Sequence, residues 1–482
     1  MFTQYRKAAG SETVNSVLNI LEGQARFVGE ERSVFLRVAE YEGKIYLDLG
    51  TKDWTAVEIS DRGWQIVSDY SVRFKRSPSM LPLPMPELGG NISELKQVLN
   101  FSDRDWVLVL CWLSFCLYPN HPHPVLILSG EQGTGKSFIC KTLKSFVDPQ
   151  KSPLLPDPKD LRDLAISANN RWTLGFDNLS GISNYLSDAL CRIATGGGFA
   201  TRTLFENDEE TIFEFTRPII VNGIDSLATR SDLLERSIIV TLPTIPVDRR
   251  LTEDELHLRL ENMKSRVFGA LLTVVSETLK KLPSVQSHRL PRMADFAKWA
   301  IAAEEALGFT PGSFLAAYDS NRQTGHETAL EASPVATAVC KLMETQDLWQ
   351  GTASDLLKAL ESLTDERTIR SRNWANNSRS LGKTLVRIAP DLRGVGIEFT
   401  KPPHKNRLIR LEKTVKLTPQ MSSNSELIQA DNNNRAVTSD VSTSYKASNS
   451  QKTSPSGTKT EYQLQPTSDI SDALRRFSTK TF

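Results

Sequence analysis

The strongest chemical signal in the chain is a glycine-rich stretch that fits the pattern G-x-x-x-x-G-K-[ST]. It follows an apolar run at 125–128 and leads into a pattern typical of a helix. In that setting the glycines let backbone N–H groups surround a triphosphate, the lysine supplies positive charge, and the hydroxyl is a Mg²⁺ ligand. We therefore predict a site for ATP and Mg²⁺, with a chance glycine-rich turn as the alternative. This glycine-rich loop consists of Gly130, Glu131, Gln132, Gly133, Thr134, Gly135, Lys136 and Ser137.

Such a site needs a carboxylate that holds the metal at the end of a neighbouring strand. The candidate is Asp177, which follows the apolar run 172–176, so Ser137 and Asp177 are the predicted metal ligands. The alternative is an aspartate that only opens a turn. The next residue, Asn178, can orient a water molecule but cannot accept its proton. Hydrolysis is therefore expected to be slow or to use another carboxylate.

Further polar positions follow in a fixed order along the chain. Gly196–Gly198 and Arg202 lie in the first of two β-prone stretches, 195–205 and 211–215, which flank an acidic turn at 206–210 and predict a hairpin. Asn222 follows the apolar run 218–221, and Arg236 precedes the apolar run 237–242. Taken alone, Asn222 fits an ordinary turn and Arg236 fits a surface arginine. Arg230 is a weaker alternative to Arg236.

The apolar runs beside these residues predict the elements that position them. Short continuous apolar runs between helical patterns are typical of a parallel sheet covered on both faces. We therefore predict an α/β core over residues 91–245, followed by a helical region over 246–335. Within that region, apolar residues recur at helical spacing from 253 to 282.

This ordered set of motifs resembles the superfamily-three helicases within the AAA+ ATPases, especially the helicase portion of viral and plasmid-type primase-helicases. The resemblance covers about residues 91–412. It implies a P-loop AAA+ core that assembles into a homo-oligomeric ring. It also implies that Asn222 contacts the γ-phosphate or its attacking water, that Arg236 reaches the neighbouring subunit's nucleotide, and that the hairpin with Arg202 grips single-stranded DNA. The catalytic residues implied in this way are Asp177, Asn178, Asn222 and Arg236.

The N-terminal region lacks a recognisable catalytic cluster. Residues 1–76 contain short runs rich in β-branched and aromatic residues, the first at 27–28, and predict a small β unit. Residues 77–90 contain four prolines and predict an extended linker. Because no primase carboxylate cluster is visible, primase activity would come from another chain.

The C-terminal region carries a local positive charge. Between residues 367 and 413 there are twelve Lys or Arg and three Asp or Glu. Helical patterns followed by a predicted hairpin make 336–413 resemble a winged helix, with Trp374 beside its recognition helix at 378–388. A solvated basic surface or a protein-binding winged helix is the alternative. Basic residues there would give salt-sensitive DNA affinity. The predicted DNA contacts are Arg202, Arg379, Lys383, Arg387, Lys401, Lys405 and Arg407.

Composition restricts the remaining possibilities. The chain has 58 Lys and Arg against 57 Asp and Glu, so it is not basic overall. Its five cysteines form no C-x-x-C pair, which favours a reducing, cytoplasmic location. The most apolar stretch, 106–117, is too short to cross a bilayer, so we expect no membrane function. Residues 414–482 are rich in Ser, Thr, Asn and Gln and predict a disordered tail.

Together these features predict an ATP- and Mg²⁺-dependent DNA helicase or translocase that acts on single-stranded or forked DNA during replication of a mobile element. The alternative is a nucleotide-gated DNA-binding protein with marginal hydrolysis, which Asn178 and the acidic turn favour. A small-molecule kinase is disfavoured by Arg236 and by the basic C-terminal region.

Overall fold

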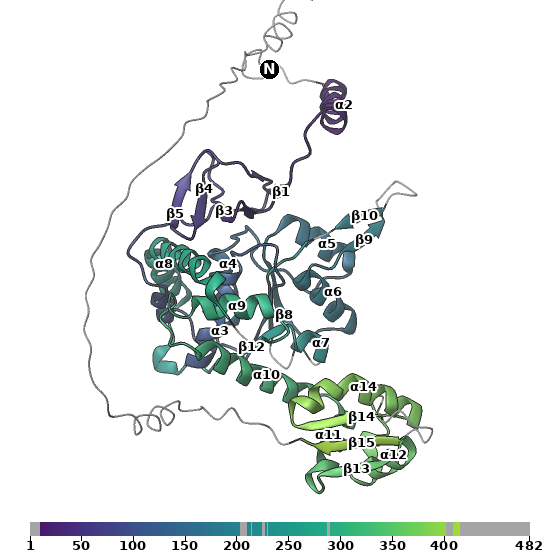
Figure 1. Cartoon of the computed structure of the whole chain (residues 1–482). Helices are drawn as coiled ribbons and strands as arrows, with labels where there is room; N and C mark the ends of the chain where they lie inside the picture. The colour runs from purple at the N-terminus through teal and green to yellow at the C-terminus, as the bar shows by residue number, and fades with distance from the viewer. Residues whose placement is uncertain are drawn as a thin grey trace, which may run out of the picture. The chain divides into compact units, whose positions relative to one another are not determined.

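The computed structural model describes residues 10–202, 210–213, 215–223, 227–228, 230–286, 290–371, 373–401 and 408–414 (Figure 1). These residues belong to one compact unit, Met1–Lys416. Lys405, Arg407, most of the predicted acidic turn and the predicted tail from 415 onward lie outside the described residues. No helix in the described ranges is long and apolar enough to span a bilayer.

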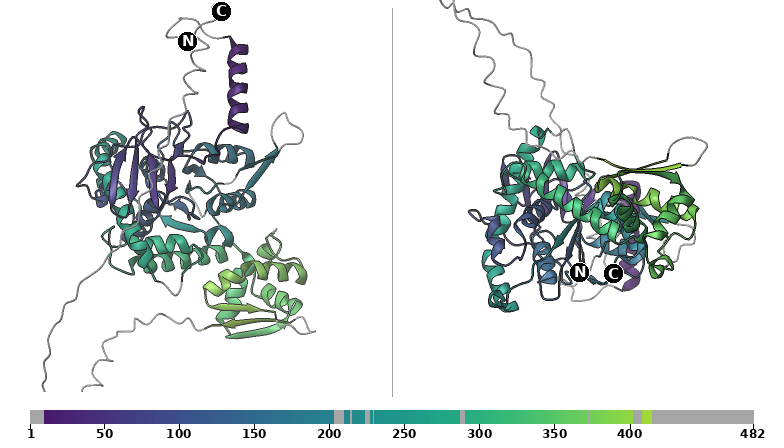
Figure 2. Two further views of the ribbon diagram at one scale, coloured as in Figure 1. Left: turned by 45° about the horizontal axis from the view of Figure 1, so that its top comes forward. Right: turned by 90° about the horizontal axis from the view of Figure 1, so that it is seen from below.

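The N-terminal region begins with a helix that the sequence interpretation missed. Helix α2 (Ser11–Phe27), the purple helix near the N-terminal end of the ribbon in Figure 2, has no buried residue. The expected strand at 27–28 is wrong, because Val14, Leu18 and Leu21 recur at helical spacing and Phe27 ends the same helix. The predicted strands then follow as β1 (Val34–Phe35), β2 (Val38–Tyr41), β3 (Lys44–Asp48), β4 (Ala56–Ser60), β5 (Gly63–Val67) and β6 (Arg73–Phe74). Strands β2 to β5 form an antiparallel sheet, and β1 pairs with β6.

Residues 77–90 are extended, but they are not the free spacer that their prolines suggest. The Leu83 N–H donates to the Leu49 carbonyl at 2.9 Å, and Leu83 is buried. The Glu87 N–H donates to the Ser265 carbonyl at 3.1 Å. A Cβ at Gly269 would lie 1.8 Å from the Glu87 carbonyl oxygen, so glycine is required there. The N–H groups of an extended segment make no hydrogen bonds within it, so they are available to donate to carbonyls of neighbouring elements, as those of Leu83 and Glu87 do.

A four-stranded parallel sheet lies at the centre of the chain, as the apolar runs predict. Its strands are β7 (Val125–Ser129), β8 (Leu174–Leu179), β11 (Ile219–Gly223) and β12 (Ser237–Thr241), in the order β12-β7-β11-β8. The connections contain α4 (Lys136–Ser145), α5 (Leu161–Asn170), α6 (Asn184–Thr195), the antiparallel pair β9 (Phe199–Arg202) and β10 (Glu210–Phe213), and α7 (Ser231–Leu234). The predicted mixed α/β class with a parallel sheet is confirmed.

Both faces of this sheet are buried, which explains its continuous apolar runs. Leu126 and Leu128 of β7 pack in a cluster with residues of α3 (Asp103–Phe115) and α8 (Glu253–Lys281). Val125 and Ile127 point to the other face and pack with residues of α5 and α6. Alternate strand residues point to opposite faces, so each face needs its own apolar set.

Helices complete the central region after the sheet. These are α8, α9 (Ala294–Ala303) and α10 (Ser313–Glu331), with 3₁₀ turns at Ile92–Gln97, Val247–Arg249 and Leu282–Ser284. Helix α10 lies within the helical region predicted for 246–335. Its Asn321 amide oxygen accepts from the Ile239 N–H at 3.0 Å, and its amide nitrogen donates to the Ile239 carbonyl. Asn321 therefore pairs with the backbone of edge strand β12 and covers it.

The C-terminal region is a second, smaller α/β arrangement. It runs through α11 (Pro334–Glu344), β13 (Leu348–Thr352), α12 (Ala353–Ser362), α13 (Glu366–Ile369), α14 (Ser378–Gly394), β14 (Ile397–Thr400) and β15 (Leu408–Lys413). The three strands form an antiparallel sheet in the order β13-β15-β14. Trp374, expected beside the recognition helix, is buried in the core with Leu381 and Leu385 of α14. Its large ring is worth more in that apolar core than at a wet surface.

Candidate functional site

The glycine-rich loop connects β7 to α4 at the carboxyl end of the parallel sheet. Gly130, Gly133 and Gly135 have φ values of 142°, 84° and 86°, a region that other residues rarely adopt. Gly135 is the N-cap of α4, so the first N–H groups of that helix open toward the loop. The Lys136 ammonium donates to the carbonyls of Gly130 and Glu131 at 2.7 and 2.8 Å. Partial burial lowers the pKa of Lys136, and nearby Asp177 opposes that shift.

Strand order brings the predicted polar residues together beside this loop. Because β11 lies between β7 and β8, Asn222 at the end of β11 reaches both neighbouring strand ends. Asp177 Oδ1 accepts from the Ser137 hydroxyl at 2.7 Å and from the Asn222 amide nitrogen at 2.8 Å. The cluster of Ser137, Asp177 and Asn222 occupies the edge where ligands bind in open α/β sheets.

Asn178 contributes through its backbone. Its N–H donates to the Asn222 side-chain oxygen at 2.8 Å, and its φ of 55° is left-handed. Asparagine tolerates this conformation better than most residues. The register between β8 and β11 shifts here, so β8 continues through Asp177 to Leu179 rather than ending at Asp177 as predicted. The resulting bulge fixes Asn222 against Asp177.

The sequence interpretation missed one residue of this cluster, Cys140. Its sulfur lies 3.2 Å from the Asn222 amide nitrogen, and burial raises the pKa of the Cys140 thiol to about 12. The thiol is therefore neutral and supports the amide from the helix side. Its place one helical turn after Lys136, on the face of α4 that turns toward the sheet, is the signal that would have found it.

Arg236 lies at the opposite end of the sheet from the loop. It precedes β12, and its carbonyl accepts from the N–H of Val125, the first residue of β7. Its guanidinium donates to the Asp232 carbonyl at 2.6 Å. Arg230 instead forms ion pairs with Asp188 and Asp232, each at 2.7 Å. The structure therefore does not bring Arg236 to the glycine-rich loop of its own chain.

The predicted DNA contacts divide into three groups. Arg379, Lys383 and Arg387 are exposed on α14 at intervals of four residues. Lys401 lies over the Phe399 ring at 5.7 Å and beside the Gly382 carbonyl at 3.4 Å. A groove of about 920 Å³ is lined by Arg379, Lys383 and Lys401 together. Lys405 and Arg407 are outside the described residues, as is the Arg202 side chain, although its backbone belongs to β9.

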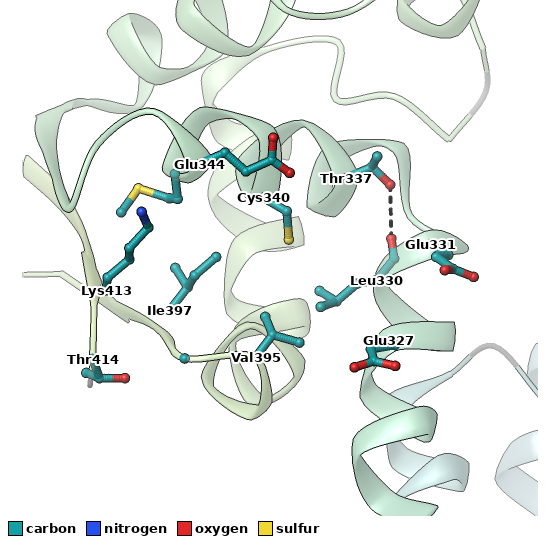
Figure 3. Close-up of a pocket in the computed structure, with 12 residues that line it drawn as sticks. Glu327, Leu330, Glu331, Thr337, Cys340, Glu344, Val395, Ile397, Lys413 and Thr414 are labelled. Carbon is teal, nitrogen blue, oxygen red and sulfur yellow. Dashed lines mark hydrogen bonds between the residues drawn. The ribbon is translucent and has the colours of Figure 1, made fainter. Parts of the chain in front are cut away.

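A second groove, of about 600 Å³, has a different character (Figure 3). It is formed where α10 and α11 meet the segment between α14 and β14. Its floor is apolar, and its three carboxylates outweigh its one cation, Lys413, so its net negative charge disfavours a triphosphate. Volume alone therefore does not identify the nucleotide site. The lining residues are Glu327, Leu330, Glu331, Thr337, Cys340, Met343, Glu344, Val395, Gly396, Ile397, Lys413 and Thr414.

Two family models match the chain in succession. Residues 92–323 match the replication protein of actinomycete integrative conjugative elements, and residues 335–425 match the C-terminal domain of the same replication protein. The chain belongs to this replication-protein family. Membership confirms the expectation that the chain acts in replication of a mobile element. The first match contains the glycine-rich loop and the second contains α14.

Comparisons with individual proteins add structural similarity at low sequence identity. No curated protein matches this replication protein. A solved structure described as an active helicase, Cch of SCCmec type IV, is similar with 12% identity and a TM-score of 0.47 over 86% of this chain and 85% of that one. The NrS-1 C-terminal region gives 12% identity and 0.36 over 83% and 91%. An inhibitor-bound JCV helicase gives 14% and 0.24 over 47% and 67%.

Proposed function

We propose that this replication protein is an ATP- and Mg²⁺-dependent DNA helicase or translocase that acts on single-stranded or forked DNA. The observation that supports this most directly is the contact of Ser137 and Asn222 with one oxygen of Asp177, beside the glycine-rich loop. A hydroxyl, a carboxylate and an amide at the end of adjacent strands are the groups that a nucleoside triphosphatase needs at the γ-phosphate.

The loop binds the triphosphate in this proposal. Its glycines and the start of α4 direct N–H groups to the phosphate oxygens. Phosphate oxygens replace the carbonyls of Gly130 and Glu131 as partners of Lys136, which is a favourable exchange because they carry full charge.

Ser137 and Asp177 hold the metal in this proposal. Among the described residues no cluster of three or more His, Cys, Asp or Glu forms a ready cation cage. Mg²⁺ typically uses one or two carboxylates, water and substrate phosphates instead, so Ser137 and Asp177 fit it. When bound, the ion neutralises charge on the phosphates.

Asn222 orients the attacking water and Asn178 fixes Asn222 from its backbone N–H. Neither amide accepts a proton, so we expect slow turnover. A nucleotide-gated DNA-binding protein with marginal hydrolysis is the second candidate function, and the presence of Asn178 beside Asp177 favours it.

Assembly and DNA binding complete the proposal. Arg236, at the opposite end of the sheet, acts on the nucleotide of the neighbouring subunit in a homo-oligomeric ring. The order of elements from α11 to β15 fits a winged helix with α14 as its recognition helix. Arg379, Lys383 and Lys401 bind phosphates there, and a separate primase acts with the ring.

The test is steady-state ATP turnover with and without single-stranded DNA. We expect Mg²⁺-dependent turnover that DNA stimulates, and its loss together with ATP binding in Lys136→Ala. Lys141→Ala is the matched control, because Lys141 lies exposed on the same helix. Unchanged ATP binding in Lys136→Ala would refute the loop assignment. ATP binding with negligible turnover under all conditions would favour the second candidate function.

A further inference from the structure

A buried carboxylate joins three helices outside the nucleotide site. Asp391, in the last turn of α14, is 2% exposed. Its Oδ2 accepts from the hydroxyl of Ser231, the first residue of α7. Its Oδ1 lies 3.0 Å from Nδ1 of His326 on α10. One side chain thus connects the C-terminal region to the central region.

The approach of these helices is close and specific. A Cβ at Gly394 would lie 2.5 Å from the His326 ring, so a glycine is needed where α14 crosses α10. Burying a carboxylate is costly unless its oxygens are hydrogen-bonded, and here both are. The contact therefore ties the orientation of α14 to α7 more tightly than an apolar contact would, since hydrogen bonds are directional.

Asp232, the residue after Ser231, contacts Arg230 and Arg236, the two arginines that are candidates for reaching a neighbouring subunit's nucleotide. The Asp232 carboxylate pairs with Arg230 at 2.7 Å, and the Asp232 carbonyl accepts from the Arg236 guanidinium at 2.6 Å. A displacement of Ser231 is thereby passed to both arginines through one adjoining residue. Helix α7 has only four residues, so it has little length over which to absorb such a displacement.

The other end of the connection carries the basic surface. Arg379, Lys383 and Arg387 are exposed on α14, and Arg387 lies one turn before Asp391. With 17 residues, α14 is about 25 Å long, so a displacement of its exposed basic residues also displaces its C-terminal end. Pro390 lies inside the helix and removes one backbone hydrogen bond next to Asp391.

We propose that Asp391 is a positioning residue that couples DNA binding on α14 to the placement of Arg230 and Arg236 through Ser231. DNA that binds α14 displaces this helix. The Asp391–Ser231 contact then transmits the displacement to α7 and so to Arg230 and Arg236. This inference rests on the proposed function and adds to it a route by which DNA regulates hydrolysis. By reciprocity, the nucleotide state must also change the affinity for DNA.

The test compares the ratio of ATP turnover with and without saturating oligothymidylate in the full chain. Asp391→Ala removes both contacts, whereas Ser231→Ala removes only the contact to α7. We expect each to lower the ratio by about fivefold or more, the lower range of allosteric coupling, while DNA affinity and turnover without DNA stay near those of the parent. The double variant should lose no more than Asp391→Ala alone, because both substitutions break one connection.

Glu398→Gln is the matched control. Glu398 pairs with Arg393 at 2.9 Å in the same region, and within the described residues it hydrogen-bonds to neither α7 nor α10. It should leave the ratio unchanged. A parental ratio in both Asp391→Ala and Ser231→Ala overturns the coupling alone, as does an equal loss in Glu398→Gln. A parent that hydrolyses no ATP, or that DNA does not stimulate, overturns the coupling together with the proposed motor.

Discussion

Arg236→Ala distinguishes a ring of cooperating subunits from an isolated ATP-binding subunit. The register pairs Ser237 with Val125 at the start of β7, whereas the glycine-rich loop follows Ser129 at its end. Arg236 therefore lies level with Pro124, six residues before Gly130, and at about 3.3 Å per residue this places it roughly 20 Å from the loop of its own chain. The variant should therefore bind ATP as the parent does, because no contact of the loop is removed.

The size of the loss of turnover in Arg236→Ala shows whether Arg236 acts within its own chain or on the nucleotide of a neighbouring subunit. Over roughly 20 Å, with an effective dielectric constant of about 20, removing the charge of Arg236 changes the barrier by about 0.8 kcal/mol, which is less than tenfold in rate. An arginine that contacts the γ-phosphate in a neighbouring subunit, called an arginine finger, raises turnover by a factor on the order of 10³–10⁵. A loss beyond about a hundredfold therefore exceeds any effect within one chain and requires action in trans.

The assay is phosphate release in mixtures of two variants. A Lys136→Ala subunit is inert but still offers its Arg236 to the intact site of an Arg236→Ala neighbour. In an equal, randomly assembled mixture, about a quarter of the interfaces combine an intact loop with an intact arginine, because each interface joins unlike surfaces of two subunits. Recovery should thus approach a quarter of the parental turnover.

The control for this experiment is Arg62→Ala, which removes an exposed arginine from the turn between β4 and β5. It should leave turnover unchanged. Parental turnover in Arg236→Ala, or no recovery in mixtures that native mass measurements show to co-assemble, would refute the assignment of Arg236 as a finger.

Three further predictions concern single sites. Asp177→Asn should keep ATP affinity but lower Mg²⁺-dependent turnover by about 10–100-fold, since the metal loses an anionic partner; parental turnover would reduce Asp177 to a turn residue. Arg379→Ala and Lys383→Ala should each lower the slope of log K against log salt by about 1 in DNA titrations, and an unchanged slope would remove that residue from the interface. His123 is buried with no hydrogen-bond partner for either ring nitrogen in the described residues, and burial lowers its pKa to about 3. As the pH falls, His123 is protonated in the unfolded chain before it is protonated in the folded chain. The free energy of unfolding should therefore fall by about 2 kcal/mol from pH 6.5 to 5 in denaturant titrations. His123→Leu should make the free energy of unfolding less dependent on pH in this range.

Several features of the site follow from short stretches of sequence. The glycine-rich loop is determined within eight residues, because the turns that its glycines permit and the start of the helix after it are local properties. The strands were recognisable as continuous apolar runs because both faces of the sheet are buried. The location of Asp177, Asn222 and Arg236 next to strands followed from the same runs.

Predictions from local sequence patterns were wrong where a competing pattern, or a contact with residues far away in the sequence, determined the structure. Phe27 and Val28 have strand propensity, but the spacing of Val14, Leu18 and Leu21 extends a helix to Phe27. Residues 77–90 have the composition of a linker, yet backbone donors such as that of Leu83 pair with distant carbonyls.

What the sequence alone determined is therefore the list of chemical groups and the strand or helix that carries each. Only the tertiary structure decided which groups meet. Strand order places Asn222 between the ends of β7 and β8, and it puts Arg236 at the far end of the same sheet. The contact of Asp391 with Ser231 joins residues that are 160 positions apart. No local pattern encodes such a pairing, because its free energy comes from desolvated groups that become neighbours only after the chain has folded.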